Sequence, residues 1–458
     1  MRTRKGVAFL VAILIFSSMA TACGTKKNVG ELAEITVNPV DAQETVNPVD
    51  TQETVNPLGS QEAIEPEISE NAQTNGVTIA FPKLETIADY QEYRAEDTGD
   101  VVLTYNVETA GVDSKGYPEL VKAVENWSEN DVKNQKEQVD QLYEEALENY
   151  KLYKDTETVS YTFQQYLYQR RADAKIFSME VCDEIDTDAA HRLSVYSGIN
   201  FDTKTGKILT VDDIVLDRER FDTFIVESVK YTLKRYYKDD LFEDYMETVM
   251  RGLDSLNWVF TDYGIQIIYG EYELATYAAG TIRVSIPYSK LQGYVKEEYL
   301  PYTDTPAIFS LSCLDEYTVE INGEQRTICL DVENNFSDAD GSHIKLAKLY
   351  LDDQEYDLAD DSLLKKNSGL EVYCYKDGNG NVYLIIDLYN KDDEHVLTLS
   401  KLENGSLTQL DSIPGGIIEK TMHWSGFETY QSRGEYFSYE DKATYAIEDN
   451  GFKKIENE

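Results

Sequence analysis

Basic residues, cysteines and long apolar runs are all scarce in this sequence. Its 458 residues include 42 Lys and Arg against 85 Asp and Glu, which gives a formal net charge of −43. A field this negative repels the phosphates of nucleic acids and attracts cationic partners. Acidity of this kind also keeps surface proteins soluble without any partner. We therefore expect no nucleic-acid binding, and either a cationic protein partner or a charge that serves solubility alone.

The motifs of common catalytic and cofactor sites are missing as well. The sequence has no Gly-rich phosphate loop, no G-x-S-x-G elbow and no H-E-x-x-H helix. A D-x-N-x-N run begins at Asp377, but Val382 and Leu388 stand where a calcium loop requires Gly and Glu. We predict no cofactor, no metal site and no enzymatic activity. Glycosidases use a pair of carboxylates, and the sequence spacing of so many Asp and Glu residues does not show which two would form it. The alternative to a non-enzymatic protein is therefore an envelope polysaccharide hydrolase with an unlocated carboxylate pair.

The one long apolar run lies at the N-terminus, from Val7 to Phe16, behind Arg2, Arg4 and Lys5. This order of basic, apolar and then small residues is typical of a secretory signal, and the run is shorter than the roughly 20 residues that span a bilayer. The small residues end at Cys23, as in the lipobox of bacterial lipoproteins. We predict a signal peptide over 1–22, a lipid on the Cys23 sulfur and a place on the extracellular face of a bacterial cell membrane. An ordinary signal peptide with a chance cysteine is the alternative.

Four cysteines remain once Cys23 is assigned to lipid: Cys182, Cys313, Cys329 and Cys374. They form no C-x-x-C pair and no cluster with histidines, which argues against a zinc site. Cys313 and Cys329 bracket a predicted hairpin, and disulfides form outside the cytoplasm. They are the candidate disulfide pair, with free buried cysteines as the alternative.

Residues 23–75 contain a nine-residue repeat that predicts a linker. The copies TVNPVDAQE, TVNPVDTQE and TVNPLGSQE begin at Thr36, Thr45 and Thr54. Each copy has a proline, no aromatic residue and too little apolar bulk for a core. We expect an extended, lipid-anchored spacer that holds the folded part away from the membrane.

Residues 76–300 combine helical patterns with strand-like runs, which predicts an α+β domain. Apolar residues recur at helical spacing from 117 to 153, and shorter helical patterns follow at 221–237 and 242–252. The strand-like runs are 77–81, 100–107, 159–170, 174–180, 191–201, 258–263, 265–269 and 281–287.

Residues 301–458 predict a separate, β-rich domain. Asn-Gly dipeptides supply the positive φ angles of a type I′ hairpin turn, and here they lie between strand-like runs. The four dipeptides are Asn322-Gly323, Asn379-Gly380, Asn404-Gly405 and Asn450-Gly451. The fold class is therefore α+β, with a mixed helix and antiparallel-sheet domain followed by a mostly antiparallel β domain.

Three stretches resemble a known family: DAAH at Asp188–His191, FDTKTGKILTVDDIV at Phe201–Val215, and the run Trp258–Leu291, which contains YELATYAAG. The family is the extracellular domain of unknown function shared by the anti-sigma-V factor, a lysozyme receptor, and by the non-catalytic part of a peptidoglycan deacetylase. The resemblance covers residues 77–295. It implies a binding or sensing module of the cell envelope, whose catalytic activity, where a relative has one, lies in another domain.

Tyrosine is abundant, with 34 against 3 tryptophans. A tyrosine ring pairs an apolar face with a polar tip, which suits sugar stacking and wet interfaces, and tyrosines are also common on exposed strands. Within the resembling stretch we take Tyr272, Glu273 and Tyr288 as the ligand-contact candidates. The resemblance and the charge favour lysozyme or another cationic protein as the ligand, and the tyrosine content favours a cell-wall glycan.

Overall fold

The computed structural model describes residues 81–455, apart from residues 114–115, 154–159, 188–190, 302–305, 336–342, 360–368, 390–394, 404 and 434–435. The expected signal peptide, Cys23 and the linker over 23–75 lie outside the described residues. Residues 73–458 group into one compact unit by their contacts. The division at residue 300 stays a prediction.

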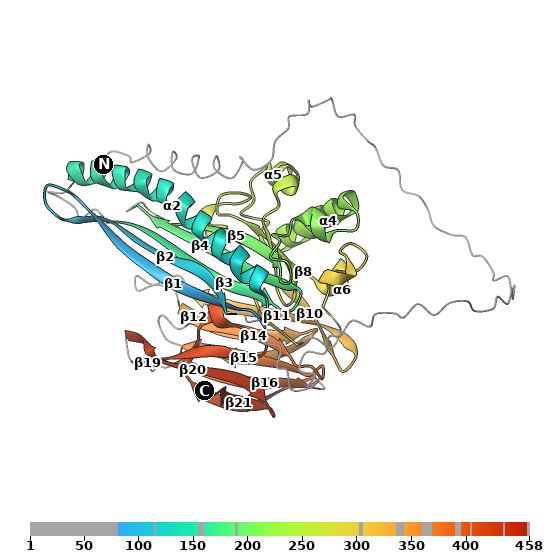
Figure 1. Ribbon diagram of the computed structural model, residues 1–458. Coiled ribbons are helices and arrows are strands. Elements are labelled where there is room, and N and C mark those ends of the chain that lie inside the picture. The colour runs from blue at the N-terminus through green and yellow to red at the C-terminus, as the bar shows by residue number, and fades with distance from the viewer. Residues whose placement is uncertain are drawn as a thin grey trace, which may run out of the picture. The chain divides into compact units, whose positions relative to one another are not determined.

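The first part of this unit is a five-stranded sheet with the order β1-β2-β3-β4-β5. Neighbouring strands run antiparallel except for β2 and β3, which are parallel because the long helix α2 connects them (Figure 1). The elements are β1 (Lys83–Arg94), β2 (Val101–Asp113), α2 (Pro118–Tyr153), β3 (Tyr161–Ala172), β4 (Ile176–Asp186) and β5 (Leu193–Asp202).

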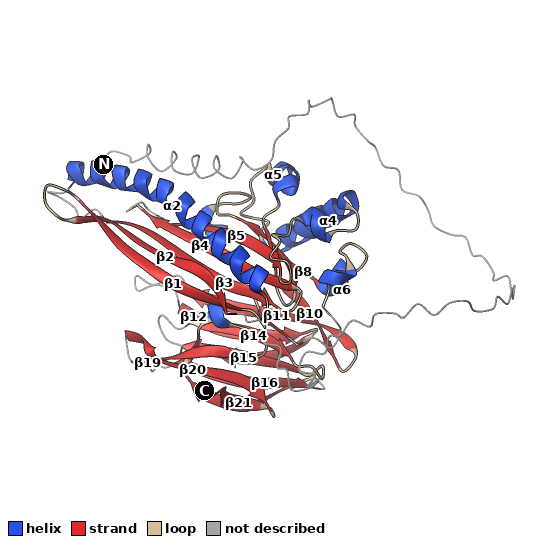
Figure 2. Ribbon diagram, in the orientation of Figure 1, coloured by secondary structure: helices blue, strands red, loops and turns tan. Residues whose placement is uncertain are grey.

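Helix α2 lies along one face of this sheet (Figure 2). Its buried apolar residues recur at helical spacing, from Leu120 and Val124 to Leu142 and Ala146. On β3, burial alternates strictly from Tyr161 to Arg170, so odd-numbered side chains pack under α2 and even-numbered ones point to the opposite face. This alternation places Tyr168 and Arg170 on the side of the sheet that α2 leaves uncovered.

A small three-stranded sheet, β6-β7-β8, covers part of that opposite face. It shares a core with α4. At Gly198 on β5, a Cβ atom would lie 2.1 Å from the carbonyl oxygen of Trp258, so only glycine lets the β6 backbone cross this closely. The elements are α3 (Val211–Ile214), α4 (Arg218–Tyr236), α5 (Tyr245–Gly252), β6 (Trp258–Phe260), β7 (Gly264–Tyr269), β8 (Ile282–Pro287) and α6 (Tyr288–Leu291).

The second part consists of antiparallel sheets, of which the one with the order β17-β16-β15-β14-β9 is buried on both faces. This burial explains the continuous apolar run of β15, VYLIIDLY, six residues of which are buried in succession. Its strands are β9 (Ala307–Ser310), β14 (Leu370–Lys376), β15 (Val382–Tyr389), β16 (His395–Glu403) and β17 (Ser406–Pro414).

The two flanking sheets have the orders β10-β11-β12-β13 and β18-β19-β20-β21. The short helix η5 (Glu419–Thr421) lies between β18 and β19. The strands are β10 (Glu316–Ile321), β11 (Glu324–Asn335), β12 (His343–Leu351), β13 (Gln354–Ala359), β18 (Gly416–Ile417), β19 (Phe427–Arg433), β20 (Tyr436–Glu448) and β21 (Gly451–Ile455).

The α+β fold class, with helices and mixed sheets first and antiparallel sheets after them, is confirmed. Asn322-Gly323 forms the expected turn with φ of 54° and 80°. At the last hairpin the left-handed pair is Asp449-Asn450, one residue earlier than expected, because Glu448 pairs with Gly451. Cys313 and Cys329, the candidate disulfide pair, are both free cysteines in this structure, which agrees with the alternative.

Candidate functional site

Two of the stretches that carry the family resemblance meet in an exposed group of rings, which we call the aromatic platform: His191, Tyr272 and Tyr277. The rings of His191 and Tyr277 are stacked with their centroids 4.2 Å apart, and the Tyr272 ring lies 5.6 Å from the Tyr277 ring. Tyr272 remains 56% exposed. The platform therefore places three neighbouring rings at the surface.

The loop after β7 holds Tyr272 in an unusual backbone conformation. Its φ of 61° lies in the left-handed region, which residues other than Gly, Asn and Asp rarely adopt. The loop is closed by Glu273, whose side-chain Oε2 accepts a hydrogen bond from the Gly270 amide at 2.8 Å. Burial raises the pKa of Glu273. The sequence retains a bulky ring at a position where glycine would fit without strain.

Acidic side chains gather beside the platform. Arg192 forms ion pairs with Glu184 at 2.7 Å and Asp186 at 3.9 Å, and the Glu271 carboxylate accepts a long hydrogen bond from the Ser194 amide at 3.4 Å. Among the described residues beside the platform, these three carboxylates outnumber the one guanidinium that pairs with them. Exposed rings with surplus negative charge suit a cationic surface.

The structure separates the three ligand-contact candidates. Tyr272 belongs to the platform, and Glu273 supports its loop. Tyr288 lies elsewhere: its hydroxyl donates to the carbonyl oxygen of Thr261 at 2.8 Å and accepts from the Arg171 guanidinium. The role of these residues in ligand contact stays a prediction.

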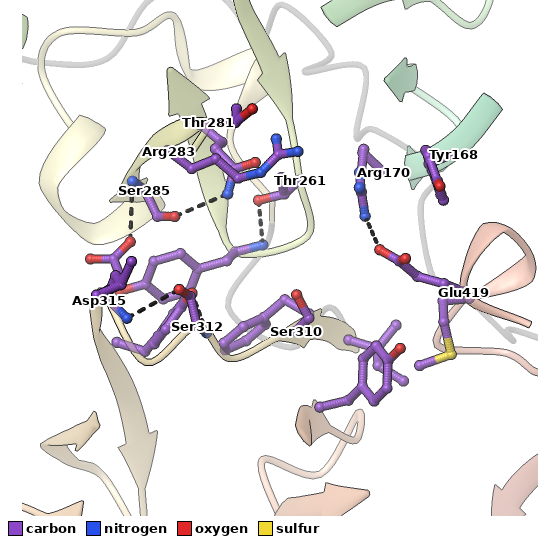
Figure 3. Close-up of a pocket in the computed structure, with 18 of the residues that line it drawn as sticks. Tyr168, Arg170, Thr261, Thr281, Arg283, Ser285, Ser310, Ser312, Asp315 and Glu419 are labelled. Atoms are coloured by element: carbon purple, nitrogen blue, oxygen red, sulfur yellow. Dashed lines mark hydrogen bonds and ion pairs between the residues drawn. The ribbon is translucent and has the colours of Figure 1, made fainter. Parts of the chain in front are cut away.

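A second feature is a cavity of about 340 Å³ between the first and second parts of the unit, which we call the tyrosine cavity (Figure 3). In Figure 3, Arg283 and Thr281 lie on one side of the space, Arg170 and Tyr168 on the other, and Ser310 below. Phe309 lines it together with six tyrosines: Tyr168, Tyr196, Tyr237, Tyr263, Tyr317 and Tyr373.

A buried carboxylate holds both arginines of the cavity. Glu180 on β4 is fully buried, with Oε2 3.0 Å from Arg170 Nε and Oε1 2.7 Å from Arg283 Nη2. These guanidiniums lower the pKa of Glu180 against the opposing effect of its burial. Arg170 is the extra residue of a β-bulge, because the register between β3 and β4 shifts between Gln169 and Arg171.

Two further carboxylates line the cavity, and both have partners. Glu419 on η5 lies 2.8 Å from Arg170 Nη1. Asp315 accepts hydrogen bonds from the amides of Ser285 at 3.3 Å and Glu316 at 2.9 Å. Burial raises the pKa of Asp315 to about 6.

Sequence reasoning missed the tyrosine cavity. Its charged residues lie on β3, β4, β8, the loop before β10 and η5, so no local spacing connects them. Within the described ranges, no group of three or more His, Cys, Asp or Glu residues could hold a metal ion. None of the described helices is both long and apolar enough to cross a membrane.

Comparison with known proteins leaves the function open. No curated protein sequence matches the chain significantly. A solved DUF3298-family structure from Bacteroides fragilis is 14% identical with a TM-score of 0.36, over 47% of this chain and 94% of its own. One from Pseudomonas aeruginosa PAO1 is 18% identical with a TM-score of 0.35, over 48% and 96%. Sequence identities and TM-scores this low carry no information about the function of this chain.

Residues 212–289 match the family described as "Protein of unknown function (DUF3298)". The matched stretch lies inside residues 77–295, where the sequence resemblance was placed, and confirms that resemblance. It includes the loop that carries Tyr272 and Tyr277. A DUF3298 domain, which belongs to a family of unknown function, is thus present at residues 212–289 of this chain.

Proposed function

We propose that this chain is a non-enzymatic binding protein of the bacterial cell envelope, and that it captures a cationic protein such as lysozyme on the aromatic platform. The lipid on Cys23 would hold it on the extracellular face of the membrane, and residues 23–75 would act as the spacer. The observation that carries the proposal is the stack of His191 on Tyr277, with the exposed Tyr272 ring tilted beside it, next to a surplus of carboxylates.

The chemistry of the platform matches a basic protein surface. Arginine and lysine side chains of a partner gain from lying over tyrosine rings, and such aromatic anchors dominate binding energy in protein interfaces. The net charge of −43 would speed the encounter with a positively charged partner. The orientation of the bound partner would then depend on the platform, because the electrostatic field of the whole chain is not specific to one face.

Calorimetric titration of the fragment Gln73–Glu458 with lysozyme at physiological salt tests the proposal. Residues 73–458 form one compact unit, so the fragment retains its cores. We expect saturable one-to-one binding that Tyr272→Ala weakens about thirtyfold, as for a hot-spot residue. Tyr90→Ala is the matched control, because Tyr90 is 59% exposed on β1, outside the platform. Binding without defined stoichiometry that disappears at moderate salt would reduce the proposal to general charge attraction.

The polysaccharide hydrolase is the second candidate, because Asp315 and Glu419 line the same cavity. The raised pKa of Asp315, about 6, suits a general acid. Against this, each carboxylate already has structural partners, so we favour binding over hydrolysis. Incubation with purified peptidoglycan distinguishes the two: release of reducing ends that is lost in Asp315→Asn would favour the hydrolase.

A further inference from the structure

We propose that the tyrosine cavity is a second binding site, specific for a neutral saccharide. This site is separate from the aromatic platform, and its existence does not depend on the capture of a cationic protein. Its volume of about 340 Å³ falls within the size range of small-ligand pockets.

The charges of the cavity point to a neutral ligand. Arg170 and Arg283 are opposed by three carboxylates: Glu180 between them, Glu419 on Arg170 and the nearby Asp315. No positive charge is left over for a phosphate or a carboxylate. Guanidinium and carboxylate groups that are already paired still offer N–H donors and oxygen acceptors at fixed positions, and such mixed donors and acceptors match sugar hydroxyls.

One donor of the cavity has no acceptor in the described part of the chain. Arg283 Nη1 is buried and makes no hydrogen bond, although its neighbour Nη2 contacts Glu180. A buried donor without a partner is unfavourable, and native structures rarely keep one without a reason. Because Nη1 is closed to water in this conformation, a ligand hydroxyl would accept from it only after the Arg283 side chain turns toward the cavity.

The aromatic wall provides the apolar half of a sugar site. Phe309 is half-buried and packs with Tyr263 and Tyr317 at centroid distances of 4.8 and 5.6 Å. The C–H faces of a pyranose ring are apolar and pack on such rings, while its hydroxyls meet polar groups at the edges. Ser310 and Thr281 bring hydroxyls to the same space.

The polar groups are held in place before any ligand arrives. The Arg283 guanidinium lies over the Tyr196 ring at 4.4 Å, and that of Arg170 lies over the Tyr168 ring at 5.0 Å. The ion pairs with Glu180 also fix both guanidiniums. A site whose side chains are already ordered loses little entropy on binding.

Calorimetry of Gln73–Glu458 with maltotriose and with the β-1,4-linked trimer of N-acetylglucosamine tests the inference. We expect saturable binding of at least one of these neutral probes and none of a galacturonic acid trimer. Ser310→Trp should lower the affinity at least tenfold, because Ser310 is exposed at the rim and an indole would fill the space. Ser406→Trp is the control on exposed β17 and should bind as the unaltered fragment does.

Arg283→Lys is a second test, because lysine keeps a positive charge beside Glu180. Loss of the planar donor should weaken saccharide binding by about tenfold, the effect of one hydrogen bond from a charged group. Lysozyme binding should be unchanged in this variant and in Ser310→Trp, which separates the two sites. Preference for the acidic trimer, no saturable binding of either neutral probe, or unchanged affinity in Ser310→Trp would overturn the inference.

Discussion

The aromatic platform and the tyrosine cavity are both built around tyrosine, and they differ in how charge is arranged near the rings. Beside the platform, Arg192 pairs with Glu184, whose side chain keeps 21% exposure, and neighbouring carboxylates remain in excess. In the cavity, Arg170 and Arg283 share Glu180, which is fully buried. Solvent screens the first arrangement more strongly than it screens the pairs made by the buried Glu180. Tyrosine therefore contributes both to an exposed acidic surface, for which we propose a cationic partner, and to a cavity with paired charges, for which we propose a neutral ligand.

The largest expected difference lies between two glutamates of the same strand, β4. Glu180→Ala leaves two guanidiniums without their shared carboxylate, and breaking a buried ion pair in this way costs about 3–5 kcal/mol. Glu184→Ala removes a partly exposed pair and should cost at most about 1 kcal/mol. Urea unfolding of Gln73–Glu458 measures both. Equal free energies of unfolding in the two variants would mean that the cavity arginines are not held as described.

The raised pKa of Asp315 predicts that the free energy of unfolding depends on pH. Its pKa in the folded chain is raised to about 6, so its stabilising contribution is complete below the unfolded value of 3.8 and is lost as pH rises through 6. The shift corresponds to about 3 kcal/mol at most. Between about pH 4 and pH 7, Asp315→Asn should therefore gain stability relative to the unaltered fragment, as measured by urea unfolding at each pH. Exposed Asp353→Asn is the control, and a parallel trend in both variants would contradict the assignment.

The two sites should also differ in how strongly salt weakens their ligand binding. Raising the ionic strength from about 0.05 to about 0.5 M should weaken lysozyme binding about tenfold or more, mainly through slower association. Saccharide binding in the cavity should change less than about twofold, because its charges are paired with each other and the ligand is neutral. Titrations at several salt concentrations measure both. Equal salt dependence would show that the two ligands share one acidic surface.

The contrast between local sequence patterns and tertiary contacts decides which parts of the fold could be predicted from the sequence. Helix α2 and the strands that carry one buried face follow from apolar periodicity, as at β3. Strand β1 was missed, because its sequence KLETIADYQEYR is exposed at most positions and shows no alternation of apolar residues. The displaced turn at Asp449-Asn450 was decided by the pairing of Glu448 with Gly451, which the dipeptide alone does not reveal.

Of the two candidate sites, the aromatic platform could be found in part from the sequence, and the tyrosine cavity could not. Tyr272 could be chosen as a candidate because it lies in a continuous motif whose residues remain neighbours in the folded chain. Arg170, Arg283 and Glu419 are brought together by a bulge, a sheet crossing and a short helix far along the chain. Such contacts depend on tertiary packing, and local sequence patterns do not report it.

The smallest expected effect concerns the backbone strain at Tyr272. Its φ of 61° penalises any residue with a Cβ atom, so Tyr272→Gly should be more stable than Tyr272→Ala by about 1 kcal/mol, although both lack the ring. Thermal and urea unfolding of the two variants measure this difference. Asn322→Gly is the control, because Asn tolerates its φ of 54° in a hairpin turn and should gain only a few tenths of a kcal/mol. Both Tyr272 variants should lose lysozyme binding equally, so that strain and recognition are separated at one position. If the alanine variant is as stable as the glycine variant, the loop relaxes without its ring, and the strained tyrosine is a consequence of packing and not a feature kept for binding.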